Sequence, residues 1–447
     1  MRRYCRNVDI TDINFIVRCI YLWLDDKKKR RDVQHFLASY SGIPYRIVRE
    51  AIACEDYSFI PPAIERIAED VKERIISKDL RIPPVKFRDR YDEGSRKWRR
   101  IGIQSPIHQI YDYIAVEGSM EMFRAKIGTY QMASIPGRGQ EKGVKAILKW
   151  LRTDEKHTRY YVQADIRKCY PSVDHDRIKR MFARDVKNAQ LLFLICSLID
   201  TFPEGLSIGS YFSQYACNYY LSYAYHYAAE QLFKVRKKRN GTVERVRLAY
   251  HILFYMDDIL LLGPSKKDLE TGIHALGEYL LDDLHLELKP EWRLLEIDYV
   301  GKDRKHHGHC IDMMGYRIYR DHISIRRRTF RNIRRSIIRA ESRIAKGQEI
   351  PLSLARTIMA RAGKIDNSDS FQFSKKHNLE KIRSRSRSTI SCNDKIVAEE
   401  KKRRRILHDR QYSTLPGETG SNAISSFREW YSGSVDSEEY PADYSRS

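Results

Sequence analysis

Residues 251–263 read HILFYMDDILLLG, in which two adjacent aspartates, Asp257 and Asp258, interrupt an otherwise apolar run. Burying carboxylates inside a strand is costly, so the pattern favours two short strands joined by a tight turn with both aspartates at its tip. A divalent metal ion could compensate their charge there. Taken alone, the stretch is explained equally well by a plain Asp-Asp turn without chemistry.

A second carboxylate ends another apolar strand. In residues 160–175, YYVQADIRKCYPSVDH, the strand pattern stops at Asp165 and polar residues follow. Two strand-end carboxylate sites offer the hard oxygen ligands that Mg²⁺ prefers, and Mn²⁺ is an alternative. Two such ions, about 3.5–4 Å apart, can activate an attacking hydroxyl and stabilise a leaving pyrophosphate. The sequence therefore indicates phosphoryl-transfer chemistry.

The rest of the chain mixes helical and strand patterns without a regular strand–helix–strand rhythm, which favours an α+β fold over a doubly wound sheet. Beyond about residue 380 there is too little apolar surface to offset the entropy of ordering, so a flexible tail is expected. The expected elements are helices within 1–80 and at 140–151, 176–187 and 326–346, a basic hairpin over 85–105 turning at Asp92-Glu93-Gly94, and strands at 159–166 and 250–262.

The chain of 447 residues carries a net charge of +23, and such a surplus favours a polyanionic partner, nucleic acid before an anionic membrane. A merely basic protein is the alternative. The eight cysteines form no CxxC pair, so neither a zinc ribbon nor a disulfide framework is indicated, and free thiols fit a reducing compartment. The most apolar early stretch, 13–24, is too short to span a bilayer and contains Arg18. We expect a cytoplasmic protein with no membrane partner.

Between the two aspartate segments lies a third, residues 205–222, GLSIGSYFSQYACNYYLS, a Gly-containing loop that runs into a helix. The ordered set Asp-x-x-x-x-Tyr, Gly-x-x-x-Ser and Tyr-Met-Asp-Asp resembles motifs A, B and C in the palm of a reverse transcriptase, over roughly residues 81–375. The resemblance implies a right-hand polymerase with an antiparallel-sheet palm. Its expected parts are a helical N-terminal region at 1–80, fingers at 81–150, the palm at 151–322, a helical thumb at 323–379 and a basic tail at 380–447.

The resemblance also implies roles for individual residues. Asp165 and Asp257 match the principal metal ligands, and Asp258 matches the third catalytic carboxylate. Tyr170 matches the steric gate, a ring that clashes with a ribose 2′-hydroxyl and so selects dNTPs. Outside this context, Tyr170 would be read as an ordinary core aromatic residue.

The middle motif departs from the Gln-Gly-x-x-x-Ser-Pro form of many bacterial reverse transcriptases. Its Ile-Gly-x-x-x-Ser-Gln form, from Ile208 to Gln214, resembles diversity-generating retroelement and some defence-associated enzymes. Gly209, Ser213 and Gln214 would then contact the nucleotide. Ile208 would meet the base or template through apolar contact, and we hypothesise relaxed fidelity.

Two further segments match nucleotide-binding features of that family. Lys97 and Arg99 resemble the Lys-x-Arg-x-Ile strand of the fingers, whose cations neutralise the triphosphate of the dNTP; a solvated basic strand is the alternative. Lys289 falls in the region of motif D, where a lysine could protonate pyrophosphate. A surface lysine explains that residue equally well.

Downstream features predict contacts with template and primer. Gly315 and Tyr316 resemble the core of a primer-grip hairpin. The expected helix at 326–346 has an apolar face and an almost purely cationic one, which at the thumb position suits a duplex backbone. The residues of that cationic face are Arg328, Arg331, Arg335, Arg339 and Lys346.

The sequence thus predicts an RNA-directed DNA polymerase that copies an RNA, expected to be a dedicated non-coding RNA, from a DNA primer with dNTPs. A retroelement and an antiviral defence system remain alternative settings, and an accessory protein is a conceivable partner. Two other activities stay open: a catalytically vestigial RNA-binding scaffold, and untemplated or protein-primed DNA synthesis.

Overall fold

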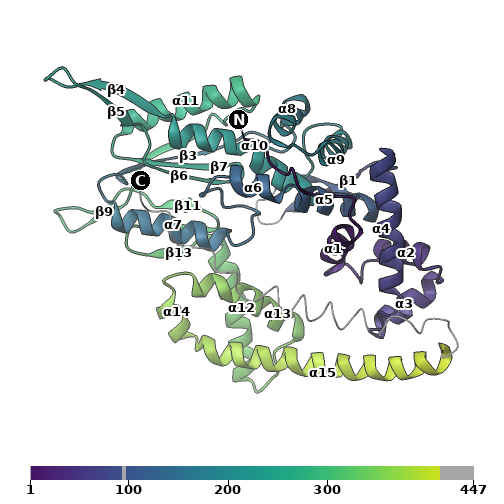
Figure 1. The fold of residues 1–447 in the computed structure, drawn as a ribbon. Helices are drawn as coiled ribbons and strands as arrows, with labels where there is room; N and C mark the ends of the chain where they lie inside the picture. The colour runs from purple at the N-terminus through teal and green to yellow at the C-terminus, as the bar shows by residue number, and fades with distance from the viewer. Residues whose placement is uncertain (1, 93–96, 413–447) are drawn as a thin grey trace. The chain divides into compact units, whose positions relative to one another are not determined.

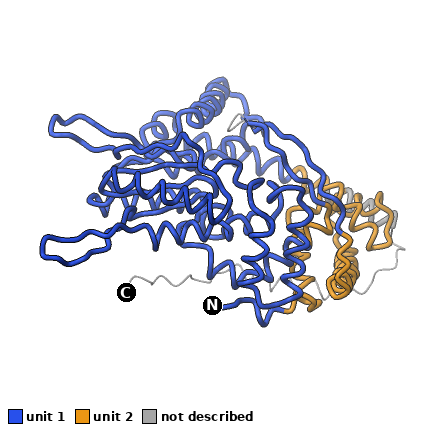
Figure 2. Tube along the Cα trace, turned by 90° about the horizontal axis from the view of Figure 1, so that it is seen from above, with its two compact units in different colours: residues 1–8, 82–104, 111–395 blue, residues 9–81, 105–110, 396–447 orange. Residues whose placement is uncertain are grey.

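The computed structural model describes residues 2–92 and 97–412 (Figure 1). The chain divides into two compact units, which Figure 2 colours separately. Unit 1 consists of residues 1–8, 82–104 and 111–395, and unit 2 of residues 9–81, 105–110 and 396–447. Unit 1 contains every site residue that the sequence singled out.

Unit 2 is built from amphipathic helices whose apolar faces meet in a small core. In the first helix, the carboxylate of Asp12 caps the N-terminus by accepting a hydrogen bond from the backbone N–H of Phe15. The fourth helix begins at Ile60 and has Pro61 and Pro62 in its first turn, where proline is well accommodated. Four of its helices are α1 (Ile13–Leu24), α2 (Arg31–Ser41), α3 (Tyr45–Ala53) and α4 (Ile60–Ser77).

The centre of unit 1 is a four-stranded antiparallel sheet in the order β6-β7-β3-β8. Helices α10 (Tyr211–Glu230) and α11 (Lys266–Leu284) contact this sheet, and α7 (Gln140–Thr153) lies on its opposite face (Figure 1). Because both faces are covered, the two central strands β7 and β3 are largely apolar and buried, whereas the edge strand β8 keeps Arg293 and Glu296 at its ends. They are β3 (Tyr160–Asp165), β6 (His251–Tyr255), β7 (Asp258–Gly263) and β8 (Arg293–Glu296). The α+β prediction is confirmed.

The expected basic hairpin is present as β1 (Lys86–Asp92) and β2 (Lys97–Ile103), which pair antiparallel. Its turn was expected at Asp92-Glu93-Gly94, and residues 93–96 lie outside the described part of the chain. Further helices of unit 1 follow: α6 (Met120–Lys126), α8 (His175–Asp185) and α9 (Ala189–Asp200). Helix α5 (Pro106–Gly118) begins in unit 2 and continues into unit 1.

The sequence C-terminal to the sheet forms a small three-stranded sheet followed by helices. The sheet consists of β11 (Ile311–Met313), β12 (Tyr316–Ile318) and β13 (Ile323–Ile325). The helices are α12 (Arg327–Ala345), α13 (Leu352–Asp366), α14 (Phe371–Lys376) and α15 (Leu379–Tyr412). One core cluster joins the apolar faces of α7, the three-stranded sheet, α12 and α13.

The expectation of a flexible chain from 380 onward is wrong for residues 380–412, which form α15. Composition missed this helix because its order comes from a few apolar anchors. Leu379 and Ile382 are buried in the core cluster, and Ile390 packs against it. Arg383 adds an ion pair with Asp366 at 2.6 Å. Residues 413–447 of the expected tail lie outside the described residues.

Two hairpins were not predicted. One is formed by β4 (Phe233–Lys237) and β5 (Val243–Arg247), and the other by β9 (Tyr299–Val300) and β10 (His306–His307). Figure 1 shows β4 and β5 extending beyond the central sheet. Across residues 2–92 and 97–412, the helices are all too short or too polar to cross a membrane. All eight cysteines are free of disulfides.

Candidate active site

Asp165 and Asp258 lie directly opposite each other, because β3 and β7 pair antiparallel with Asp165 in register with Asp258. Asp257 occupies the turn between β6 and β7, and its carbonyl accepts a hydrogen bond from the N–H of Ile166 at 3.0 Å. Met256 adopts a left-handed conformation, φ 55°, that makes the turn tight. The backbone therefore gathers the three predicted carboxylate residues at one end of the sheet.

The carboxylates repel one another in a partly dry environment. Burial, followed by the charges of Asp257 and Asp165, raises the pKa of Asp258 to about 6. Burial and the charge of Asp165 also raise the pKa of Asp257. The ionised carboxylates of Asp257 and Asp258 are therefore not fully compensated by nearby positive charge. A bound divalent cation would supply that charge.

The donor chemistry fits magnesium, since carboxylate oxygens are its preferred protein ligands. The residues that would hold it are Asp165, Asp257 and Asp258. Within the part of the chain that the structure describes, no group of three or more His, Cys, Asp or Glu side chains is already gathered in metal-binding geometry. Asp165 is engaged by a lysine side chain.

That lysine is Lys289. Its ammonium forms an ion pair with Oδ1 of Asp165, and its backbone N–H donates to the carbonyl of Asp165 at 2.9 Å. The Oδ1 atom is buried and accepts no hydrogen bond of regular geometry. The neighbouring bridge between Ile166 and Leu288 holds the two segments in this register. Lys289 is thus brought to the carboxylates, although its role in proton transfer stays a prediction.

Tyr170 follows Asp165, the last residue of β3, by five residues and lies near the charge of Asp257. Burial, together with the neighbouring thiols of Cys217 and Cys169 and the charge of Asp257, raises the pKa of Tyr170, so the phenol stays neutral. Its carbonyl accepts a hydrogen bond from the N–H of Leu206 at 2.8 Å, which ties it to the loop before α10. Beside it, the buried thiols of Cys169 and Cys217 are 3.6 Å apart. The backbone of Tyr170 is thus fixed next to the carboxylates, and the gate role of its ring stays a prediction.

The loop before α10 is hydrogen-bonded to strand β2 of the basic hairpin. The carbonyl of Ile208 accepts a hydrogen bond from the N–H of Gly102 on β2 at 3.0 Å. Gly209 is exposed with φ 109°, and a Cβ there would lie 3.0 Å from both the carbonyl oxygen of Gly102 and Cγ2 of Ile101. Only glycine fits this close approach without displacing β2.

Ser213 and Gln214 follow in the first turn of α10. The hydroxyl of Ser213 is buried and accepts from the N–H of Ser207 at 3.3 Å, so it holds the loop. Its predicted nucleotide contact would therefore be made through the loop backbone. Gln214 is half-buried, and its contact with a nucleotide stays a prediction.

Asp112, which the sequence did not single out, anchors the loop before α10 through hydrogen bonds. Its fully buried carboxylate accepts from the hydroxyl of Ser210 at 2.7 Å and from the N–H of Phe212 at 3.3 Å, while Gln104 donates to its other oxygen at 3.2 Å. Burial raises the pKa of Asp112 to about 7 against these hydrogen bonds. No local pattern marks this residue, because the loop partners Ser210 and Phe212 lie about a hundred residues away in sequence.

On the fingers hairpin, Lys97 and Arg99 share one face of β2 with Ile101, since strand side chains alternate. Ile101 is the residue that borders Gly209. Arg99 pairs with Asp92 at 3.3 Å, and its charge lowers the pKa of Asp257, partly opposing the effect of burial. The predicted triphosphate-binding cations therefore lie on the face of β2 that borders the loop.

Gly315 forms the turn between β11 and β12 with φ 85°. Tyr316 is buried in the core cluster, and the ammonium of Lys364 lies 5.0 Å from its ring centroid. The ring itself is therefore packed inward. The predicted primer contact at Gly315 and Tyr316 stays a prediction, and the accessible groups for it would be the backbone of the turn and Lys364.

Helix α12 has the two faces that its sequence predicted. Ile333 and Ile337 are buried, and Phe330 and Ile344 pack against the core cluster. The cationic residues are exposed, so their charges face solvent. They are Arg328, Arg331, Arg335, Arg339 and Lys346.

An antiparallel palm sheet with strand-end carboxylates, a basic fingers hairpin and a cationic helix bundle after the palm define a nucleotidyltransferase of the polymerase type. The family model for reverse transcriptase (RNA-dependent DNA polymerase) matches residues 65–297, more than half of the chain. The chain belongs to this family, and it is an RNA-directed DNA polymerase that uses a nucleic acid template and dNTPs. Family members use divalent metal ions. A search of curated proteins found no match to the chain.

Proposed function

We propose that the protein copies an RNA into cDNA by two-metal nucleotidyl transfer, with Asp165, Asp257 and Asp258 as the metal-holding residues. The observation that carries this is the register of Asp165 with Asp258 across β3 and β7, next to the turn residue Asp257. When bound, two Mg²⁺ ions activate the primer 3′-hydroxyl and stabilise the departing pyrophosphate. The residues around them supply position and charge.

In this proposal, each neighbouring element has one task. Lys97 and Arg99 bind the triphosphate, and the exposed backbone at Gly209 admits the nucleotide close to β2. The ring of Tyr170 excludes a 2′-hydroxyl, which selects dNTPs. Lys289, which pairs with Asp165, would donate a proton to pyrophosphate. The exposed arginines of α12 bind the phosphates of the template–primer duplex.

We further propose a dedicated non-coding RNA template and a cytoplasmic retroelement or antiviral defence role. The support is the Ile-Gly-x-x-x-Ser-Gln form of residues 208–214, which resembles enzymes of those systems. Genes beside this one would separate the two settings, because a variable-repeat target with an accessory protein accompanies diversification. Sequencing the nucleic acid that copurifies with the protein would identify template, product and priming mode together.

The test of catalysis compares wild type with Asp257→Ala/Asp258→Ala in labelled dNTP incorporation on a primed RNA with Mg²⁺. We expect the double variant to lose incorporation while it still binds the primed RNA. Equal incorporation by both proteins would favour the alternative of an RNA-binding scaffold. Incorporation that needs no RNA template would favour untemplated or protein-primed synthesis.

A further inference from the structure

The β4–β5 hairpin concentrates positive charge at a place that the catalytic proposal does not use. Residues 233–247 contain seven lysines and arginines and one acid, Glu244. The hairpin connects α10 to β6, joining β6 at its first residue, His251, whereas Asp257 follows the last. At about 3.3 Å per strand residue, β6 alone separates His251 from Tyr255, the residue paired with Asp258, by about 13 Å, and the hairpin ends at Arg247, before β6 begins. Its cations therefore cannot serve the reacting nucleotide.

One face of this hairpin has its charges neutralised. Side chains directly opposite each other in an antiparallel pair lie on the same face, and Arg236 is opposite Glu244. Glu244 forms ion pairs with Arg236 at 3.6 Å and with Lys238 of the turn at 3.1 Å. On the same face, Lys234 forms an ion pair with Asp268 at the start of α11. The cations of this face therefore form ion pairs with acidic side chains of the protein itself.

The other face carries no acid. It consists of three cross-strand pairs, Phe233 with Arg247, Val235 with Arg245, and Lys237 with Val243. The guanidinium of Arg245 stacks 4.6 Å from the ring centroid of Phe233, and that of Arg247 lies 6.0 Å from it. Val235 and Val243 are 71% and 65% exposed. Hereafter these six residues are called the outward face.

We propose that the outward face is a second nucleic-acid-binding surface, which binds the sugar–phosphate backbone of the folded part of the template RNA that is not being copied. Three unneutralised cations on one face match a polyanion. Stacking on Phe233 holds the guanidinium groups of Arg245 and Arg247 in place, so less side-chain entropy is lost on binding phosphate. Exposed valines beside them can pack against sugars. The inference rests on the RNA-templated function of the family.

The test uses two double variants of the full-length protein that remove the same charge from the two faces. Arg245→Gln/Arg247→Gln alters the outward face, and Arg236→Gln/Lys238→Gln alters the neutralised face. The probe is an RNA duplex of about 20 base pairs without an extendable 3′-end, and its affinity is measured at several salt concentrations. A short primed RNA measures single-turnover extension as the control for the catalytic site.

Each phosphate contact contributes about 0.9 to the slope of log affinity against log salt. We expect the outward-face variant to lower the slope by up to about 1.8, and the neutralised-face variant to leave it near wild type. Extension of the short primed RNA should be unchanged in both. Equal slopes in all three proteins would overturn the inference, as would face-dependent binding to duplex DNA or to anionic vesicles in place of RNA. Absent extension in wild type would instead contradict the proposed function.

Discussion

Lys289 places its ammonium on Oδ1 of Asp165 while its own backbone N–H donates to the carbonyl of the same residue at 2.9 Å. The backbone contact fixes the segment, and the side chain occupies an oxygen that metal binding would require. One lysine thus neutralises a carboxylate that we propose holds metal, and it lies where a proton donor for pyrophosphate would be needed.

The first prediction concerns this pair. Lys289→Ala should lower the single-turnover rate about 10²-fold, because it removes a proton donor from the leaving pyrophosphate. Lys289→Arg keeps the charge but cannot give up a proton, so it should not restore the rate. The measurement is rapid-quench extension of a primed RNA at saturating Mg²⁺. Full activity of Lys289→Arg would show that only the charge matters.

The second prediction is a pH dependence of stability at Asp112. Its folded-state pKa of about 7 lies above the usual value of 3.8, so the stability it contributes is fully present below about pH 4 and is lost as pH rises through 7. The loss is about 1.4 kcal/mol per pH unit in that window. Asp112→Asn cannot ionise, and Gln104 can turn its amide to keep their hydrogen bond.

Thermal denaturation of wild type and Asp112→Asn at pH 5 and pH 8 checks this. We expect the Tm of the variant relative to wild type to rise between pH 5 and pH 8. As a control, Asp112→Ala leaves Ser210 and Phe212 without their acceptor and should be destabilised at both pH values. A Tm difference for Asp112→Asn that is the same at both pH values would contradict the assignment of a neutral buried acid.

How much of this site the sequence predicts depends on whether the signal is local. Asp165 ends one apolar run, Asp257 and Asp258 interrupt another, and the turn between β6 and β7 follows directly from that pattern. The burial of Asp112 depends on Ser210 and Phe212, far away in sequence, so nothing near it distinguishes it from a solvent-facing helical residue. The face of the β4–β5 hairpin that carries Arg245 likewise depends on strand register, which composition does not contain. Helix α15 was missed for a similar reason, since Leu379 and Ile382 are ordered by the core cluster.

The third prediction tests the gate. Tyr170→Val should lower discrimination against rNTPs at least tenfold, or about 1.4 kcal/mol, because it removes the ring that would clash with a 2′-hydroxyl. Tyr170→Phe keeps the ring and should keep the discrimination, since the neutral phenol is not required. The ratio of kcat/KM for dNTP and rNTP incorporation measures the effect. Unaltered discrimination in Tyr170→Val would make the residue a core aromatic.

The fourth prediction concerns fidelity at Ile208. Its backbone carbonyl accepts a hydrogen bond from the N–H of Gly102, and its side chain is half-buried and apolar. Ile208→Gln offers hydrogen bonds to the base or template and should lower misincorporation, whereas Ile208→Val should behave as wild type because it stays apolar. Sequencing of cDNA made from a defined RNA gives the error rates. Unchanged misincorporation in Ile208→Gln would reject the link between this side chain and fidelity.

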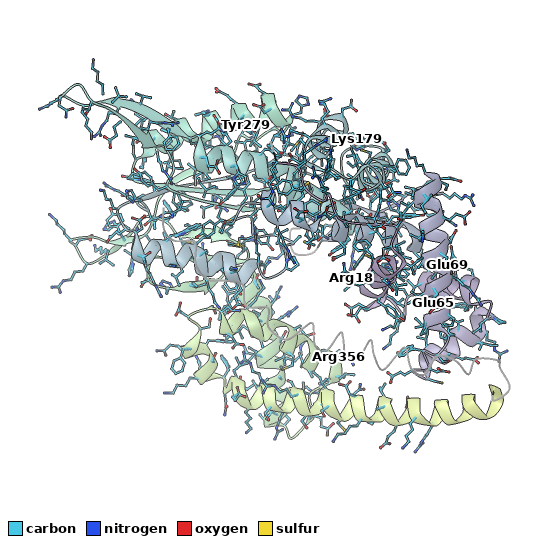
Figure 3. The ribbon with its side chains drawn as sticks, in the orientation of Figure 1. Arg18, Glu65, Glu69, Lys179, Tyr279 and Arg356 are labelled. Atoms are coloured by element: carbon cyan, nitrogen blue, oxygen red, sulfur yellow. The ribbon has the colours of Figure 1, made fainter. Side chains whose placement is uncertain are left out.

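The fifth prediction addresses the cationic face of α12. Arg335 is exposed one turn from Arg331 and Arg339, on the side of the helix away from buried Ile333 and Ile337. Arg335→Gln should weaken binding of a template–primer duplex similarly for every sequence and reduce the salt slope by about 0.9, because a phosphate contact carries no base information. The control is Lys179→Gln, which removes the same charge from α8. Lys179, labelled in Figure 3, forms an ion pair with Asp200 of the protein itself. This control variant should leave the slope unchanged. If both variants changed the slope equally, net charge alone would explain the affinity, and α12 would be a solvated helix face.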